Sequence, residues 1–147
     1  MWEFSNREWI AAVPEVVFSY FTDMEKLAAA IPYVARFERV TPGEFGVGSQ
    51  VRQVQMVEGK EVSGVVEIAE FEPNRVIALR NERGPVSAVY RYALEEENGG
   101  TRLAFVASIA VEGADPNVEP EIVGVIRDWD INQLQGFKAA IETPVSR

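Results

Sequence analysis

The fold of this chain is decided by the stretch PEIVGVIRDWDINQLQGFKAAIE at residues 120–142. Apolar residues recur there every three or four positions, which is the period of an amphipathic helix. The helix is predicted to begin at about Val118 or Pro120 and to end at Glu142. Its apolar stripe, which needs a partner surface elsewhere in the chain, comprises Ile122, Ile126, Trp129, Phe137 and Ile141.

The partner surface is predicted to be a sheet. The period changes to two between residues 34 and 112, with strands expected near 34–41, 48–58, 61–72, 75–82, 86–97 and 101–112. Connections of two to five residues make consecutive strands antiparallel, because a parallel return needs a crossover of a dozen residues or more. One further strand is predicted at Trp2–Ala12, which gives about seven strands.

Two short helices are predicted between the first strand and the rest of the sheet. Pro14 suits a first helical turn, where its missing N–H is not needed. Thr22 or Asp23 can cap a second helix, Met24–Ala30, which ends before Pro32. No linker or internal repeat interrupts the chain, so residues 1–147 are predicted to form a single domain.

These elements predict an α+β helix-grip fold. Its features are a curved, seven-stranded antiparallel sheet, two short helices after strand 1, and a long C-terminal helix across the concave face. A helix is only about 10–12 Å wide, so it cannot cover the whole inner face of an opened sheet. An internal cavity is therefore expected between the sheet and the C-terminal helix.

Composition narrows the classes of function. Twenty-three acidic residues against 14 basic ones give a formal charge of −9, which argues against nucleic acid as a partner. No apolar run reaches the roughly 18 residues of a membrane span, and the N-terminus lacks the pattern of a secretory signal. We expect a cytoplasmic protein without membrane insertion.

The chain contains neither cysteine nor histidine. Disulfides, thiolate nucleophiles and the commonest metal ligands are thereby excluded. We therefore expect no metal and no cofactor. Any acid–base chemistry would fall to Asp, Glu, Tyr or Lys.

The order of elements and four local motifs resemble one known superfamily over nearly the whole chain. The motifs are Ala12–Phe18 leading to Asp23, Gly46–Ser49, Phe71–Arg75, and Gly99–Leu103. Together and in this order they resemble the START-like superfamily, also called SRPBCC, which includes lipid-transfer domains, plant pollen allergens and bacterial polyketide cyclases. The resemblance implies a helix-grip fold that encloses a hydrophobic ligand.

One branch of this superfamily, the aromatase/cyclases, carries a strand that resembles Trp-x-Trp-x-Ser-x-Arg and faces the pocket. The corresponding positions here hold Val62, Gly64, Val66 and Ile68. The serine and the arginine of that pattern are absent, and the two tryptophans are replaced by Val and Gly. The resemblance therefore implies a pocket that is more apolar than in that branch.

Strand alternation gives a second view of the pocket wall, because residues two apart share a face. On the strand near 75–82, Leu79 and Arg80 would exchange faces after a slip of one residue. Polar side chains on the apolar face need a partner from the protein or from a ligand. The residues predicted to bind the ligand are Val62, Val66, Ile68, Leu79, Asn81, Tyr90, Tyr92, Phe105, Trp129, Gln133 and Phe137.

Several interpretations compete at this point. The same residues would also form a plain hydrophobic core. If a cavity exists, the favoured function is binding or transport of a lipid-, polyketide- or isoprenoid-like molecule. The alternative is a cyclase or dehydratase that uses Tyr90, Tyr92, Asn81 or a helix carboxylate. A protein-interaction module is a third interpretation, and Val65 and Val89 on the outer face leave room for a homodimer contact.

Overall fold

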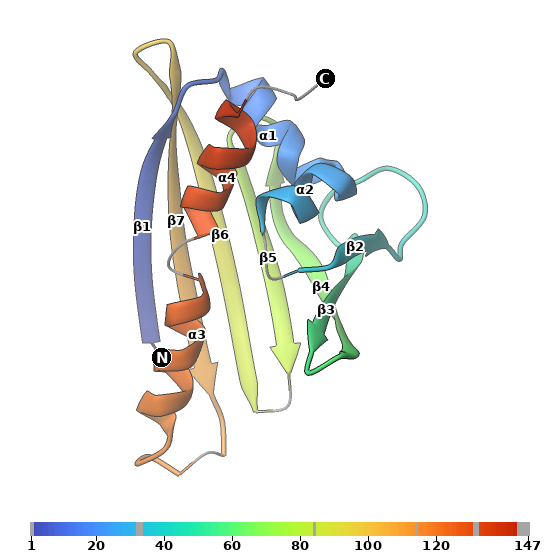
Figure 1. The fold of residues 1–147 in the computed structure, drawn as a ribbon, viewed down its shortest axis with the longest axis vertical. Coiled ribbons are helices and arrows are strands. Elements are labelled where there is room, and N and C mark those ends of the chain that lie inside the picture. The colour runs from blue at the N-terminus through green and yellow to red at the C-terminus, as the bar shows by residue number, and fades with distance from the viewer. Residues whose placement is uncertain (1, 32–33, 84, 114, 131–132, 144–147) are drawn as a thin grey trace.

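A seven-stranded antiparallel sheet with helices across its inner face makes up the computed structural model of this protein (Figure 1). The structure describes residues 2–31, 34–83, 85–113, 115–130 and 133–143, without the side chains of residues 83, 129 and 130. The helix-grip architecture predicted from the sequence is thus confirmed.

The sheet has the strand order β1-β7-β6-β5-β4-β3-β2. Strands β2 to β7 follow one another as the predicted meander, and β1 occupies the opposite edge by pairing with β7. The predicted strand near 34–41 is shorter than expected, since only four residues pair with β3. The strands are β1 Trp2–Ile10, β2 Arg36–Arg39, β3 Gln50–Val57, β4 Lys60–Glu72, β5 Val76–Arg83, β6 Val86–Glu97 and β7 Gly100–Val111.

The two short helices follow β1 as predicted. Helix α1, Pro14–Thr22, has its proline in the first turn. Helix α2, Met24–Ala30, is capped by Asp23, whose carboxylate accepts hydrogen bonds from the backbone N–H groups of Glu25 at 3.0 Å and Lys26 at 3.2 Å. Asp23 rather than Thr22 is therefore the cap, because only its carboxylate meets the unpaired N–H groups of that turn.

The C-terminal helical region contains α3, Glu119–Asp130, and α4, Gln133–Glu142. Residues 131 and 132 between them lie outside the described part of the chain. In none of the described segments does a helix combine the length and the apolar character that crossing a membrane requires.

The two C-terminal helices differ in how they pack. Leu134 and Phe137 of α4 are fully buried in the main core with residues of α1, α2 and the sheet. On α3, Val123 is the buried residue among the described side chains, and it packs with Ala88 and Ile109 in a small separate cluster. The interior is therefore packed more completely beneath α4 than beneath α3.

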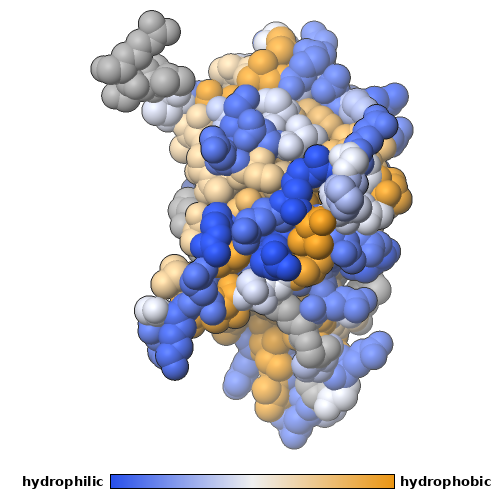
Figure 2. All heavy atoms as spheres, turned by 90° about the vertical axis from the view of Figure 1, so that its right-hand side faces the viewer, coloured by the Kyte–Doolittle hydropathy of each residue, from blue (hydrophilic) through white to orange (hydrophobic). Residues whose placement is uncertain are grey.

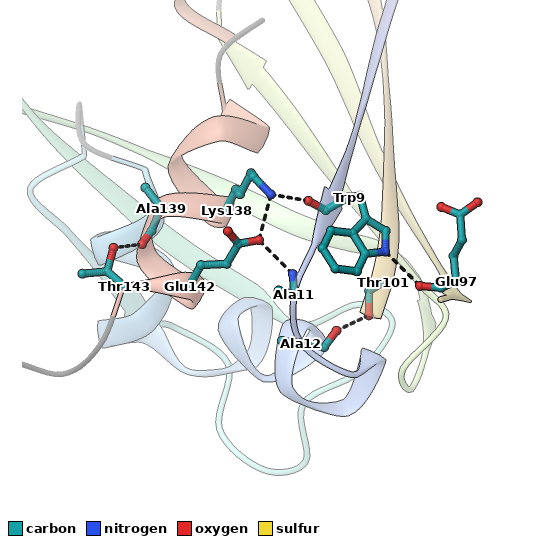
Figure 3. A network of polar contacts seen from close by, with 9 residues as sticks. All are labelled: Trp9, Ala11, Ala12, Glu97, Thr101, Lys138, Ala139, Glu142 and Thr143. Atoms are coloured by element: carbon teal, nitrogen blue, oxygen red, sulfur yellow. Dashed lines mark hydrogen bonds and ion pairs between the residues drawn. The ribbon is translucent and has the colours of Figure 1, made fainter. Parts of the chain in front are cut away.

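A network of polar contacts ties the end of α4 to the end of β1 (Figure 3). The ammonium group of Lys138 donates to the carbonyl of Trp9 at 2.7 Å and pairs with the carboxylate of Glu142 at 2.8 Å. That carboxylate also accepts a hydrogen bond from the N–H of Ala11 at 2.8 Å. These contacts fix α4 against the edge of the sheet.

Candidate functional site

A cavity of about 240 Å³ lies on the inner face of the sheet, beside α3. Strands β3 to β6 supply most of its wall, and the helical region closes it. Val125 of α3 belongs to the wall and is 56% exposed, so the cavity reaches the surface beside this helix. The lining residues are Ile31, Phe37, Gln53, Gln55, Val66, Leu79, Asn81, Val86, Ala88, Tyr90, Tyr92, Val125, Ile126 and Gln133.

Strand register determines which side chains reach the cavity. Leu79 of β5 pairs with Ile68 and Tyr90 on the neighbouring strands, and all three point to the inner side. Arg80 points to the other face, where its guanidinium lies 3.5 Å from the carboxylate of Glu67. The orientation of β5 that the sequence left open is thereby settled with Leu79 inward.

A hydrogen bond between two buried side chains closes one end of the cavity. The hydroxyl of Tyr92 on β6 donates to the side-chain oxygen of Gln133 at the start of α4, and the two residues are 2% and 6% exposed. Because both groups are shielded from water, this contact holds α4 at a defined position over the sheet. It also places a phenol and an amide at the cavity wall.

Aromatic rings from α1, β7 and α4 pack around Tyr92. The ring of Tyr92 lies 4.7 Å from Phe21, 5.0 Å from Phe105 and 6.0 Å from Phe137 between centroids. Phe21 and Phe137 stack on each other at 4.6 Å. These rings fill the interior on the α4 side, so the cavity ends at Tyr92.

The structure brings six of the predicted ligand-binding residues together at the cavity wall. They are contributed by strands β4, β5 and β6 and by α4. The six are Val66, Leu79, Asn81, Tyr90, Tyr92 and Gln133.

Four of the other five predicted residues lie away from this wall. Ile68, Phe105 and Phe137 are buried in the core, because the aromatic packing on the α4 side leaves no space beside them. Val62 is 41% exposed near the turn between β3 and β4 and does not line the cavity, although it pairs with Gln55. The side chain of Trp129 lies outside the described residues.

Two glutamines of β3 were missed by the sequence reasoning. Gln53 and Gln55 line the cavity, and Gln55 is buried. Alternation from the buried Val51 places both on the inner face, although polar side chains are more common on an outer face. Phe37, Val86 and Val125 were also not predicted, because they lie at a short edge strand, a strand end and the flank of a helix stripe.

The fourteen described lining residues carry no formal charge. Two groups outside the cavity have shifted pKa values. A hydrogen bond to Glu61 raises the pKa of the Arg36 guanidinium, and a hydrogen bond from Lys138 lowers the pKa of the Glu142 carboxyl. The described part of the chain holds no cluster of three or more Asp and Glu side chains arranged to bind a metal ion.

The cavity can therefore offer apolar contact and neutral hydrogen-bonding groups. Amides and phenols can each donate and accept, so they can orient a hydroxyl or a carbonyl on a bound molecule. A tyrosine hydroxyl can also polarise a carbonyl by donating to its oxygen. Apolar walls with a few polar groups are the usual composition of small-molecule sites.

Three solved structures with the same fold match this chain over nearly their whole length. The Zhui aromatase/cyclase from Streptomyces sp. R1128 superposes with a TM-score of 0.77 at 16% identity, covering 96% of this chain and 93% of that one. TTHA0849 from Thermus thermophilus gives 0.74 at 19% identity, with 95% and 96% covered. Ara h 8.0201 gives 0.77 at 14% identity, with 95% and 97% covered.

Identities this low show a common fold only. Comparison with curated protein sequences returns no significant match. A family model described as polyketide cyclase / dehydrase and lipid transport, however, matches residues 1–142. The match includes all seven strands and every lining residue of the cavity. The chain therefore belongs to the polyketide cyclase/dehydrase and lipid transport family.

Proposed function

We propose that this protein binds or carries a small hydrophobic molecule of lipid-, polyketide- or isoprenoid-like character in the cavity beside α3. The observation that carries the proposal is the contrast between the two halves of the C-terminal helical region. Buried rings fill the interior at α4, whereas a hollow of about 240 Å³ remains beside α3. Protein interiors are otherwise close-packed, so an apolar hollow that opens to the surface is typical of a ligand site.

The size of the cavity favours a compact ligand. Sites for drug-sized molecules usually measure roughly 300–1,000 Å³, and this cavity is slightly smaller. A molecule of one or two rings, or one end of a longer chain whose remainder leaves beside Val125, would fit this space. Membership of a family that contains lipid transport proteins supports this class of ligand.

A matched pair of substitutions on β4 tests the proposal. Val66 is buried at the cavity wall, whereas the adjacent Val65 is 42% exposed on the other face. Val66→Phe should occupy the cavity and abolish saturable binding of naphthol, an uncharged fluorescent probe. Val65→Phe adds the same ring outside and should leave binding unchanged. If both variants bind like the wild type, the cavity is not the binding site.

A second candidate function is a cyclase or dehydratase reaction in the same cavity. It is favoured by the two tyrosines at the wall, Tyr90 and Tyr92, and by the fold shared with an aromatase/cyclase. In this reaction water would take a proton from the carbon next to a substrate carbonyl, and a phenol would donate a hydrogen bond to that carbonyl oxygen and stabilise the resulting enolate. Cyclisation of a poly-β-ketone substrate should then fall by about 10²-fold in Tyr90→Phe or Tyr92→Phe. Equal rates with and without the protein would exclude this activity.

A further inference from the structure

The polar side chains that line the cavity are all uncharged. Amides and phenols line it, and the described lining residues include no Asp, Glu, Lys or Arg. From the described lining residues, a carboxylate or ammonium group that entered this site would gain no opposite charge in exchange for its lost hydration, which opposes binding. The polar members of the wall are Gln53, Gln55, Asn81, Tyr90, Tyr92 and Gln133.

One atom of this set lacks a hydrogen bond. The side-chain oxygen Oδ1 of Asn81 is buried without a partner, and it is the one such side-chain atom in the described part of the chain. A buried acceptor that is left unpaired destabilises the folded protein, so native structures usually supply a donor. Asn81 lies between Val66 of β4 and Ala88 of β6, and both belong to the cavity wall. Oδ1 itself has almost no accessible surface, so a molecule in the cavity supplies the missing donor once the amide turns about χ2 and brings this oxygen to the cavity wall.

The position of Asn81 gives the orientation of such a molecule. Asn81 is four residues along β5 from Ile77, which pairs with Tyr92 on β6. At about 3.3 Å per residue, Asn81 lies about 13 Å along the sheet from the closed end at Tyr92. Leu79 and Tyr90 occupy the intervening row. An apolar body would thus lie along this row, with its hydrogen-bond donor at the Asn81 end.

We propose that the cavity selects an uncharged apolar molecule that carries a hydroxyl group, and that this hydroxyl donates its hydrogen bond to Oδ1 of Asn81. This inference rests on the proposed function, and it adds a chemical class to it. Neutral alcohols and phenols are favoured over fatty acids and other anions. Asn81 acts as a specificity-determining residue, while the apolar wall supplies the bulk of the contact area.

Two pairs of naphthalene probes, all substituted at the same ring carbon, test the two parts of this proposal by calorimetry at neutral pH. Naphthol and methylnaphthalene have the same shape and differ in the hydroxyl donor. Naphthamide and naphthoate have the same shape and differ in charge. We expect naphthamide to bind at least about a hundredfold more tightly than naphthoate.

Variants at Asn81 test whether its side-chain oxygen accepts the hydrogen bond from the probe's hydroxyl group. In Asn81→Leu, the preference for naphthol over methylnaphthalene should fall by about tenfold, because one hydrogen bond is lost. Asn81→Asp keeps an acceptor oxygen at the same position and should retain the preference. Gln135→Leu makes the equivalent change at an exposed amide of α4 and should have no effect. Each variant is judged by the ratio of its dissociation constants for methylnaphthalene and naphthol. A general change in the cavity affects both probes alike and cancels in this ratio.

The outcomes separate this inference from the proposed function. If all four probes bind the wild type and Asn81→Leu with similar affinities, the cavity is a ligand site without this selectivity, and the inference is wrong. It is also wrong if naphthoate binds as tightly as naphthamide, or if Asn81→Asp loses the preference for naphthol. If no probe binds the wild type, the proposed function fails together with the inference. Thermal unfolding of each variant verifies that it is folded.

Discussion

At the scale of single residues, Tyr92 combines packing and polarity in one side chain. Its ring is enclosed by Phe21 and Phe105, while its hydroxyl donates to Gln133 of α4. A buried amide that loses a hydrogen-bond partner destabilises the folded state more than the mean value of a hydrogen bond suggests. Tyr92 therefore contributes to the stability of the sheet–helix contact as well as to the cavity wall.

The substitution Tyr92→Phe should lower the free energy of unfolding by about 1–2 kcal/mol, because it removes the hydroxyl and keeps the ring. Chemical denaturation measures this difference. Tyr20→Phe is the matched control, since the hydroxyl of Tyr20 is half-buried and bonds the carbonyl of Ala140 at a long 3.4 Å. A loss in the control equal to that of Tyr92→Phe would contradict the special role of the buried pair.

Gly100 is a position where a side chain has no room. A Cβ atom there would lie 2.5 Å from the carbonyl oxygen of Ile10 and 2.5 Å from the ring of Trp9. The indole of Trp9 is itself held by a hydrogen bond to the carbonyl of Glu97 at 2.8 Å. The glycine thus allows β1 and the start of β7 to approach closely.

Gly100→Ala should therefore destabilise the protein by about 1–3 kcal/mol, because either the backbone or the indole must move. The midpoint of thermal unfolding measures the effect. Gly46→Ala serves as the comparison, since a Cβ there meets no atom within 4 Å. Equal midpoints for Gly100→Ala and the wild type would show that the indole shifts without cost.

At the scale of elements, the two C-terminal helices have different attachments. Two fully buried residues and the Lys138–Glu142 network hold α4. Helix α3 has Val123 as its buried residue among the described side chains, and Glu119 accepts a hydrogen bond from the indole of Trp2 at 2.7 Å. Local opening follows the number of buried contacts, so α3 is expected to open more readily than α4.

Hydrogen exchange measured by mass spectrometry should show faster exchange in α3, Glu119–Asp130, than in α4, Gln133–Glu142. Binding of a ligand in the cavity should slow exchange in α3 and leave α4 nearly unchanged, because α3 forms part of the wall and α4 is already fixed. Uniform protection of both helices without ligand would contradict the difference in packing.

The network at the end of α4 also predicts a dependence on pH. The hydrogen bond from Lys138 and the bond from the N–H of Ala11 lower the pKa of Glu142 below 4.5, its usual value. A group whose pKa is lowered in the folded state stabilises the fold above its unfolded pKa. This stabilisation is lost as the pH falls through the lower, folded value.

Glu142→Gln should therefore reduce stability at neutral pH and have a smaller effect below the folded pKa of Glu142, where the wild type is also protonated. Unfolding by urea at several pH values measures the difference. Glu121→Gln is a control at an exposed carboxylate of α3. A constant difference between Glu142→Gln and the wild type at all pH values would rule out this linkage.

Most of the elements could be predicted because their signals are local. Alternation marks the strands, short turns make them antiparallel, and Pro14 and Asp23 mark the helix starts. The pairing of β1 with β7 could not be predicted in this way, since periodicity says nothing about which strand lies beside which. The boundary between the cavity and the packed core could not be predicted from local patterns either.

The candidate site shows why alternation alone does not separate cavity residues from core residues. Inner-facing residues such as Tyr90 and Phe105 have the same pattern in the sequence, yet Tyr90 lines the cavity and Phe105 is enclosed by other rings. The difference depends on how far the helices approach the sheet, which is a property of tertiary packing. Gln53 and Gln55 were missed for the opposite reason, because polar residues at a wall resemble an outer face.

At the scale of the whole molecule, charge is the dominant feature of the surface. The formal charge is −9, and several ion pairs, such as Arg91 with Glu70, lie on exposed parts of the sheet. Figure 2 shows that hydrophilic side chains divide the apolar surface on this side into separate areas. A homodimer through Val65 and Val89 stays a prediction that sedimentation can test.

Self-repulsion at this net charge predicts a response to salt. Raising sodium chloride from about 0.01 M to 0.5 M shortens the screening length from about 30 Å to only a few ångströms and should raise the midpoint of thermal unfolding. Differential scanning calorimetry at neutral pH provides the measurement. A midpoint that falls with added salt would indicate that exposed ion pairs contribute more to stability than the repulsion removes.

The pairing of the two strands that lie farthest apart in the chain has a consequence for how the protein is made. Trp2 pairs with Ile109, so β1 has no partner until β7, far along the chain, has been synthesised. Until then its edge is open to incorrect association. Sequence-distant pairing of this kind also slows the search for the native topology. The strand Trp2–Ile10 therefore stays open to incorrect association until Gly100–Val111 is available to pair with it.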